Sequence, residues 1–469
     1  MSTDPHTLRL LLAAALVLAY LGMCAAIWHG QRRKARAAQA QARALALAPQ
    51  GARPLLLAWA SQTGQAEALA KHTAELLHTA GEAVHLLPLG SVTVQTLAQA
   101  TRALFIVSTY GEGDAPDMAA PFVNGPMTGT PALPQLEYAV LALGDASYAH
   151  FCGFGRTLDA WLAATGARPL FERIDADQAS ARASADALAH WQRQLGHVAR
   201  IEHLPAWQEP AWQRWTLARR VHLNPGSAGQ PVYHLELAPA GDNASAGPVP
   251  LPEWQAGDLV QIRPPADPDH PRDYSIASLP SDGRVHLLVR RQQRADGTPG
   301  MASGWLTSTL AEGEPVDLRL RAHTAFRLGD NATRPLILIG NGTGLAGLRS
   351  HLKARAAAGQ GENWLIFGER QAAHDWLYRD DIARWQAAGL LARVDTAFSR
   401  DGPRKRYVQD VLAAEAGQLR QWLARGAAVY VCGSLQGMAT GVDTALRHAV
   451  GHETVDALIA QGRYRRDVY

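Results

Sequence analysis

Three short apolar runs, each followed at once by a loop rich in glycine and hydroxyl residues, constrain the fold of this chain most strongly. They lie at 54–60, 103–107 and 138–143. Continuous apolar runs of this length are typical of parallel strands that are buried on both faces. The carboxyl ends of parallel strands meet at one edge of a doubly wound sheet. We therefore expect the three loops to lie together at that edge, where such sheets bind ligands.

The first of these loops is a candidate anion site. Its sequence is Ser61-Gln62-Thr63-Gly64-Gln65, and apolar residues recur at helical spacing after it. Free amides at a helix N-terminus and the helix dipole favour an anion at that point. The loop lacks the Gly-Lys-Ser/Thr ending of a nucleoside-triphosphate loop. Taken alone, it is equally compatible with an ordinary strand-to-helix turn.

The second and third loops each carry a tyrosine, Tyr110 and Tyr148. A flat aromatic ring suits stacking on a flavin, although either tyrosine alone could be a core residue. Together the three loops resemble those of the flavodoxin-like domain of diflavin reductases, over about 54–198. The resemblance implies an FMN site in which the first loop holds the phosphate and the two tyrosines flank the ring. It also implies three further residues beside the FMN: Gly111, Asp145 and Cys152.

A second domain is expected over 213–328, after a linker at 199–212 that is rich in prolines and tryptophans. The runs at 215–237 and 257–262 alternate like the strands of an antiparallel barrel. Within this region, Arg272-Asp273-Tyr274-Ser275 is similar to the FAD-binding strand of the ferredoxin–NADP reductase superfamily. The second domain is therefore predicted to be an FAD-binding antiparallel β-barrel.

The resemblance gives each residue of that motif a role that suits its chemistry. Arg272 offers a bidentate fork to the FAD pyrophosphate, Tyr274 a stacking face, and Ser275 a hydroxyl close to flavin N5. Ser303 matches a donor of the family's second pyrophosphate loop. Taken alone, Arg272 could be a surface arginine in a salt bridge.

The third domain, expected over 333–469, begins with a buried strand at 336–339 and a glycine-rich turn that holds Gly342, Thr343 and Gly344. Such turns are common and are weak evidence alone. The later motifs resemble those of the ferredoxin–NADP reductase-like NADP-binding α/β domain, although Gly347 stands where that family has proline. The implied contacts to the 2′-phosphate and adenine of NADPH are Ser399, Arg400, Lys405, Tyr407 and Gln409. A site for NADH would place an acidic group at the ribose instead.

The end of the chain supplies the candidate catalytic residues. Cys432 stands at the end of a predicted strand, and Asp467 and Tyr469 follow near the C-terminus. By the resemblance, Ser275, Cys432 and Asp467 form the hydride-transfer group, and Tyr469 covers the flavin face until nicotinamide displaces it. Cys432 could instead be a small buried core residue.

The N-terminal region predicts a membrane anchor. The stretch 8–29 is almost entirely apolar and is followed by the basic cluster 32–36. About 20 such residues span a bilayer, and the basic cluster stays on the cytoplasmic side. We therefore expect one transmembrane helix at 8–29, a tether at 30–53, and catalytic domains on the cytoplasmic side of the inner membrane. A cleaved signal peptide is the alternative, but its charge would precede the apolar run.

Charge and cysteine content exclude several classes of protein. Cys24, Cys152 and Cys432 are an odd number, at spacings that fit neither a disulfide framework nor a zinc site. No basic stripe on a folded domain points to nucleic acid. Residues 55–200 have a net charge of −5. Such a face would attract a positively charged partner, or it is simply a solvated surface.

These features predict an NADPH-dependent reductase that passes electrons through FAD and FMN to a one-electron acceptor, a haem or iron–sulfur protein at the membrane. The alternatives are a sulfite reductase flavoprotein subunit and a flavin-based redox sensor or assembly protein with little turnover. Only about sixty residues separate Pro210 from Arg272. The helical connecting insertion of larger diflavin reductases therefore has no room here.

Overall fold

The computed structural model describes residues 54–199, 210–240, 251–294 and 296–469. The expected membrane helix at 8–29 and tether at 30–53 lie outside the described residues. Within the described ranges, no helix is long and apolar enough to cross a membrane. The longest of them, α6 (Ala181–Ala199), carries arginine, aspartate, glutamine and histidine side chains. The predicted localisation as a single-pass inner-membrane protein is corrected accordingly.

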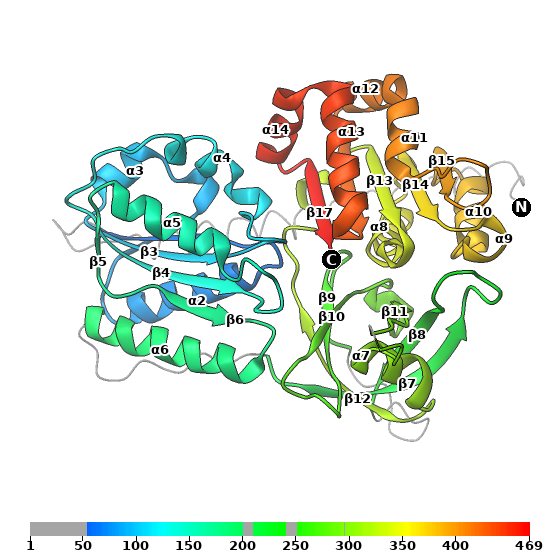
Figure 1. Ribbon diagram of the computed structural model, residues 1–469, viewed down its shortest axis with the longest axis horizontal. Coiled ribbons are helices and arrows are strands. Elements are labelled where there is room, and N and C mark those ends of the chain that lie inside the picture. Colours follow the sequence, from blue (N-terminus) through cyan, green and yellow to red (C-terminus); the bar gives the residue numbers. More distant parts are fainter. Residues whose placement is uncertain (1–53, 200–209, 241–250, 295) are drawn as a thin grey trace, which may run out of the picture.

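The first domain is a doubly wound parallel sheet with helices on both faces (Figure 1). Its strand order is β2-β1-β3-β4-β5, with β6 also paired to β4. The strands are β1 (Leu55–Ala60), β2 (Val84–Pro88), β3 (Arg102–Ser108), β4 (Glu137–Gly144), β5 (Arg168–Pro169) and β6 (Ile174–Asp177). The helices are α2 (Gln65–Thr79), α3 (Val94–Gln99), α4 (Ala120–Val123), α5 (Gly153–Ala164) and α6. The predicted parallel sheet is confirmed.

The central strands β1, β3 and β4 each contribute side chains to two hydrophobic cores, which explains their continuous apolar sequences. Leu56 and Phe105 point to the core under α3, α4 and α5. Their neighbours Leu57 and Leu104 point to the opposite core under α2 and α6. Successive side chains of a strand alternate between the two faces of the sheet. When both faces are covered, every position of a central strand is therefore apolar.

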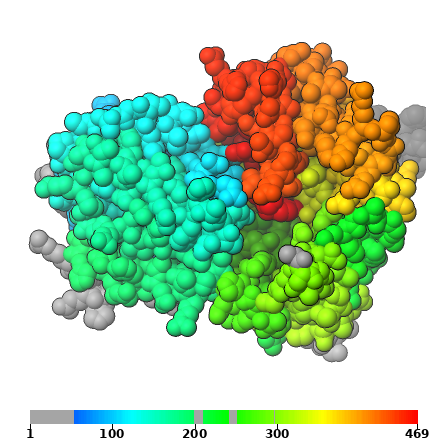
Figure 2. Space-filling view, in the orientation of Figure 1, coloured from blue at the N-terminus to red at the C-terminus, as the bar shows by residue number. Residues whose placement is uncertain are grey.

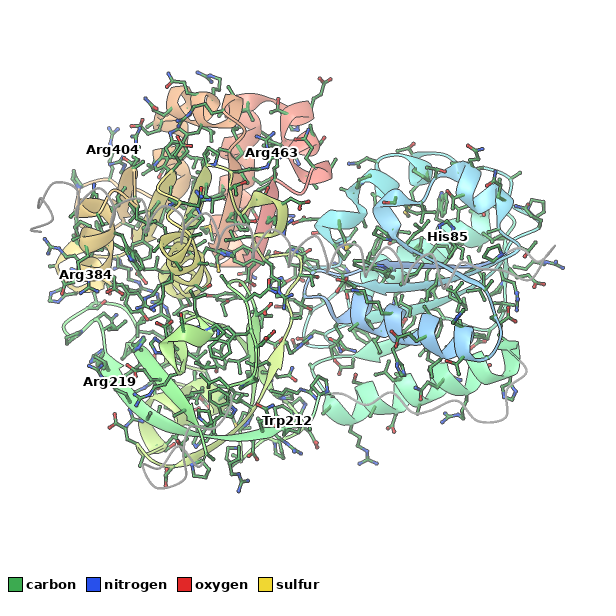
Figure 3. All side chains as sticks on the ribbon, turned by 180° about the vertical axis from the view of Figure 1, so that it is seen from behind. His85, Trp212, Arg219, Arg384, Arg404 and Arg463 are labelled. Atoms are coloured by element: carbon green, nitrogen blue, oxygen red, sulfur yellow. The ribbon has the colours of Figure 1, made fainter. Side chains whose placement is uncertain are left out.

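The second domain is a six-stranded antiparallel sheet of order β10-β9-β12-β7-β8-β11. Its strands are β7 (Gln213–His222), β8 (Val232–Pro239), β9 (Leu259–Arg263), β10 (Arg272–Ser275), β11 (Val285–Arg290) and β12 (Pro315–Arg321), and α7 (Met301–Gly304) leads into a π-helical turn, η5 (Trp305–Thr309). Alternate residues such as Leu235 and Leu237 fill its core. The strand order ends at β10 and β11, and these two edges approach each other where the amide of Ala277, just after β10, donates to the carbonyl of His286 in β11 at 2.8 Å. On its outer side, Trp212, labelled in Figure 3, stacks under the guanidinium of Arg319 at 4.5 Å.

The third domain is again parallel, with strand order β15-β14-β13-β16-β17. Its strands are β13 (Leu336–Asn341), β14 (Asn363–Glu369), β15 (Arg393–Phe398), β16 (Ala428–Gly433) and β17 (Tyr464–Val468). Its helices are α8 (Leu345–Ala357), α9 (Ala372–Asp375), α10 (Arg379–Ala387), α11 (Val408–Ala414), α12 (Ala416–Ala424), α13 (Thr440–Val450) and α14 (His452–Ala460). The edge strand β17 lies where the three domains meet (Figure 1). Its pairing places Asp467 beside Cys432 of β16.

The first domain contacts both of the others through polar side chains. Arg466 of β17 forms an ion pair with Asp117, and its Nε lies 3.0 Å from Asp117 Oδ2. Gln62 Nε2 donates to the carbonyl of Arg466 at 3.1 Å. From the second domain, Thr324 donates to Glu67 at 2.7 Å. These contacts fix the first sheet with its loop edge toward the other two domains.

Replacing Asp117 with asparagine is expected to loosen this interface. The carboxylate and guanidinium are only 16% and 20% exposed, and removing one member of a largely buried pair leaves the other charge uncompensated, at a cost of roughly 2–3 kcal/mol. Hydrogen–deuterium exchange of the amides at 61–67 and 321–324 should become faster. The exposed Asp456→Asn variant should leave it unchanged. Equal protection in wild type and Asp117→Asn would contradict the role of this pair.

Candidate functional site

A cavity of about 640 Å³ lies where all three domains meet. The first domain contributes Thr63 from the loop after β1, and Asp145 and Tyr148 from the loop after β4. Figure 2 shows the molecule hollowed at this meeting point. The volume is in the range of cofactor pockets. Two of the three predicted loops therefore reach one cavity.

Strand β10 and the start of α7 line the wall of this cavity that belongs to the second domain. Arg272, Tyr274 and Ser275 lie on β10, and Ser303 lies in α7. The guanidinium of Arg272 donates to the carbonyls of His270 at 2.9 Å and Pro271 at 3.2 Å. The hydroxyl of Ser303 accepts from the amide of Gln292 at 3.1 Å. All four residues predicted from the second domain are thus brought together.

Ser275 and Asp467 line this cavity, and the third candidate catalytic side chain, Cys432, contacts Asp467 from outside the lining. Ser275 Oγ donates to Asp467 Oδ2 at 2.7 Å, and Cys432 Sγ donates to the same oxygen at 3.5 Å. All three side chains are buried. Burial and the nearby Asp467 carboxylate raise the pKa of the Cys432 thiol well above its ordinary value. The thiol is therefore protonated at neutral pH and acts as a hydrogen-bond donor.

A second cavity of about 700 Å³ opens at the carboxyl edge of the third sheet. Its lining includes six of the predicted residues: Gly342, Thr343, Ser399, Tyr407, Gln409 and Tyr469. Tyr469 and Thr343 line both cavities, and the Tyr469 hydroxyl donates to Thr343 Oγ1 at 3.1 Å. The tyrosine ring therefore stands at the junction between the two cavities.

Several predicted residues make other contacts. Gln62 and Gln65 bind the other domains, since Arg321 Nη2 donates to Gln65 Oε1 at 2.9 Å. Tyr110 packs on the third domain, 5.7 Å from the guanidinium of Arg466. Eight more lie outside the lining of both cavities: Ser61, Gly64, Gly111, Cys152, Gly344, Arg400, Lys405 and Cys432. Cys152 is fully buried in the core of the first domain, whereas Arg400 and Lys405 are exposed in the segment beside Arg404 (Figure 3).

Sequence reasoning missed the arginines at the junction. Arg290, the last residue of β11, lines both cavities and forms an ion pair with Glu369. Arg370 lines the second cavity. Both arginines could have been found in the sequence, because each stands at or just after the end of an apolar strand, at 285–290 and at 363–370.

A second polar cluster lies between the second and third domains. His234, Glu236 and His286 place one possible ligand atom each within 4.8 Å of one another, the single such group in the described ranges. Arg284 already pairs with Glu236 at 2.8 Å, and Arg219 approaches it at 3.4 Å. These two cations neutralise the carboxylate, which weakens it as a metal ligand.

This cluster predicts acid-sensitive stability. Burial lowers the pKa of both His234 and His286 to about 4, whereas an unfolded histidine titrates near 6.5. Between these values the unfolded chain binds more protons, so stability falls as the pH falls, by up to about 1.4 kcal/mol per pH unit and histidine. Urea unfolding at pH 7 and pH 5 measures the slope. The His286→Gln substitution should make the free energy of unfolding depend less on pH. Substitution of the exposed His448 by glutamine should leave this dependence unchanged.

The comparisons with known proteins agree with this architecture. Residues 57–191 match the Flavodoxin family model, and residues 338–444 match that of the Oxidoreductase NAD-binding domain. The chain is 30% identical to a "Sulfite reductase [NADPH] flavoprotein alpha-component" of Neisseria meningitidis serogroup B, over 87% of this chain and 88% of that protein. The proteins of the same name from Vibrio vulnificus and Aliivibrio fischeri are each 29% identical over about nine-tenths of both chains. The 536-residue alignment exceeds the 469 residues of the chain, so the Neisseria relative carries insertions that this chain lacks.

Fold, cavities and relatives together define a flavin-dependent oxidoreductase that uses a nicotinamide nucleotide. The chain belongs to the diflavin reductase family. It is an NADPH-dependent reductase, and the predicted cofactors FAD, FMN and NADPH are confirmed at the level of the family.

Proposed function

We propose that this protein takes hydride from NADPH at the junction of the two cavities and delivers single electrons from its first domain to an acceptor protein. The observation that carries the proposal is the hydrogen-bonded group Ser275, Cys432 and Asp467, which lies beside Tyr469, where the two cavities join. When bound, FAD takes up two electrons as hydride, and FMN passes electrons on singly. Asp467, Ser275 and Cys432 would orient the reacting edge and exclude water from it.

The residues of the first cavity fit FAD, and the second domain would be the FAD-binding domain, over 213–328. Tyr274 supplies an aromatic face, and Arg272 a fork for the pyrophosphate. Ser303 would add a hydroxyl donor at the second pyrophosphate position. Arg290 would supply a further positive charge at the junction, because it lines both cavities.

The loops of the first domain, over 54–198, would hold FMN. Thr63, Asp145 and Tyr148 line the same cavity as the FAD residues. In this arrangement the two flavin sites open on one another without an intervening wall, which supports direct electron transfer. Ser61 Oγ accepts from the amide of Ala66 at 3.2 Å and so holds the turn in which the phosphate would bind. Tyr110 would flank the ring from the side that faces Arg466.

NADPH would occupy the second cavity, in the third domain over 333–469. Ser399, Tyr407 and Gln409 line it, together with Arg370. Arg400 and Lys405 are exposed close by in the sequence and would meet the 2′-phosphate from the solvent side. Tyr469 would have to move before nicotinamide reaches the flavin. Its 53% exposure and its single side-chain hydrogen bond to Thr343 make that movement inexpensive.

The acceptor would be a haem or iron–sulfur protein. The relatives are named as components of sulfite reductase, so the partner component of such an enzyme is the second candidate. The net negative charge of 55–200 favours a basic partner and electron transfer that weakens with salt.

Reduction of cytochrome c by the purified, flavin-loaded protein tests the proposal. NADPH-driven turnover that requires both flavins and falls with ionic strength is expected. An absence of turnover with both flavins bound would overturn it and favour the sensor or assembly role. Addition of a sulfite reductase haemoprotein distinguishes the acceptors, because sulfide then forms only if the chain serves that partner.

A further inference from the structure

The loop that would hold the FMN phosphate carries no cation of its own. Residues 61–67 include no lysine or arginine, and their one charged member, Glu67, is acidic. Free amides and the dipole of α2, which begins at Gln65, favour an anion at this point. A phosphate monoester, however, has a charge of about −1.5 to −2 at pH 7. A countercharge for it must therefore come from outside the loop.

A guanidinium reaches this loop from the second domain. Arg321, the last residue of β12, donates from Nη2 to Gln65 Oε1 at 2.9 Å. Its Nη1 donates to Asp273 Oδ2 at 2.6 Å. Asp273 lines the first cavity, and so does Thr63 of the loop. The Arg321 side chain, which is 17% exposed, therefore lies between the loop and the wall of the cavity proposed to hold the flavins.

The backbone that follows Arg321 packs closely on the same loop. A methyl carbon at Gly64 would lie 2.6 Å from the carbonyl oxygen of Ala322, so the two segments are in direct contact. Thr324 Oγ1 donates to Glu67 Oε2 at 2.7 Å. Residues 321–324 thus cover the loop and hold the guanidinium beside it. Partial exclusion of water from this contact strengthens any attraction between the guanidinium and an anion.

The present partners of Arg321 leave it able to bind an anion. A guanidinium has five N–H donors in a planar fork that matches phosphate oxygens, and the contacts to Gln65 and Asp273 use two of them. The Asp273 side chain is 32% exposed, so water weakens that ion pair. The amide oxygen of Gln65 is uncharged, and a phosphate oxygen is the stronger acceptor. Arg321 therefore has both the charge and the donors that the phosphate requires.

We propose that Arg321 binds the FMN phosphate from the second domain, so that the FMN site is shared between two domains. This inference rests on the proposed function, in which the loop of the first domain holds FMN. FMN binds more tightly when the two domains are docked, and bound FMN in turn holds the domains together, because such coupling is reciprocal. In a chain without room for the connecting insertion, the cofactor thereby contributes to domain docking.

Titration of the full-length, FAD-loaded protein with FMN, after its own FMN has been removed, tests the proposal. The dissociation constant for FMN should rise about ten- to a hundredfold in Arg321→Gln, as expected when a hydrogen bond to a charged group is lost. Arg321→Lys keeps the charge and should recover part of the affinity. Riboflavin lacks the phosphate, so its dissociation constant should be the same in all three proteins.

Arg214→Gln is the matched control for these titrations. Arg214 lies on β7 of the same sheet and pairs with Asp317 of β12 at 3.1 Å. This substitution should leave the affinity for FMN unchanged. Wild-type affinity for FMN in Arg321→Gln, or equal weakening of FMN and riboflavin, would overturn the proposal.

Asp273→Asn separates phosphate binding from a purely structural role of Arg321. If Arg321 acted only by bracing Asp273, loss of that carboxylate would weaken FMN binding as much as Arg321→Gln does. Because Asp273 competes with the phosphate for one guanidinium, we instead expect FMN to bind as tightly as in wild type or more tightly. Absorbance of the bound FAD shows whether each variant retains its other flavin.

The ³¹P NMR signal of bound FMN gives a readout that does not depend on affinity or turnover. It should shift in Arg321→Gln and stay in place in Arg214→Gln, and an unchanged signal in Arg321→Gln would refute the contact. If the wild-type protein does not bind FMN, the proposed function fails. If it binds FMN and the signal is the same in Arg321→Gln, only the role of Arg321 fails.

Discussion

Asparagine in place of Asp467 is expected to lower the rate of FAD reduction by NADPH by about 10²–10³-fold. The carboxylate accepts from Ser275 at 2.7 Å and from Cys432 at 3.5 Å through a single oxygen, and it lines the cavity proposed to hold the FAD. Hydride departure leaves positive charge on the nicotinamide, and a buried carboxylate stabilises that charge. The neutral amide keeps the shape but not the charge. Stopped-flow absorbance of the FAD measures the step directly.

Asp456→Asn is the matched control for this prediction. Asp456 lies on α14, and its side chain is 50% exposed and paired with Arg447 at 2.9 Å, so its loss changes a carboxylate of the same domain far from the cavities. Its FAD should be reduced at the wild-type rate. Equal rates in all three proteins would remove Asp467 from the hydride-transfer group. FAD content and thermal unfolding of each variant separate a chemical effect from loss of structure.

Alanine in place of Gly344 is expected to destabilise the third domain by about 3 kcal/mol or more. The turn after β13 passes so close to β16 that a methyl carbon at this position would lie 2.6 Å from Cα of Gly433, and closer still to the carbonyl oxygen of Cys432. Both neighbours are backbone atoms of a fully buried strand, so they cannot move aside cheaply. Urea unfolding of the purified protein gives the change in free energy, and NADPH affinity should fall with it.

Gly417→Ala provides the contrast. Gly417 lies in α12, where an added methyl group meets nothing within 4 Å. Alanine at an exposed helical position should stabilise by about 0.5–1 kcal/mol. A Gly344→Ala protein that unfolds at the wild-type urea concentration would show that the turn relaxes, and that close approach is not what requires glycine there.

The sequence predicted the two parallel domains well, because their signals are local. A strand buried on both faces must be apolar throughout, as β3 and β13 are, and the loops that follow such strands necessarily share one edge. The group Ser275, Cys432 and Asp467 was predicted only through the resemblance of its motifs to a known family, because its members lie far apart in the sequence. The alternating strands of the second domain likewise predicted an antiparallel sheet, but such a pattern does not specify how closely the two edges of that sheet approach each other.

Contacts between domains could not be predicted from the sequence. Gln62 and Tyr110 were expected to bind cofactor, and nothing in their neighbourhood indicates that they would pack against Arg466. Docking depends on the shapes of folded surfaces, which are composed of residues distant in sequence.

The alternation of β17 has an evolutionary consequence. Arg466 and Asp467 are neighbours in the chain, but one binds Asp117 of the first domain and the other Ser275 of the second. Successive side chains of a strand point to opposite faces. The insertion or deletion of one residue before 466 would therefore turn Arg466 and Asp467 each to the other's face, and both contacts would be lost together. Point substitutions can therefore tune domain docking and hydride transfer separately, but length changes cannot. Insertions and deletions in β17 are therefore expected to be more damaging than substitutions.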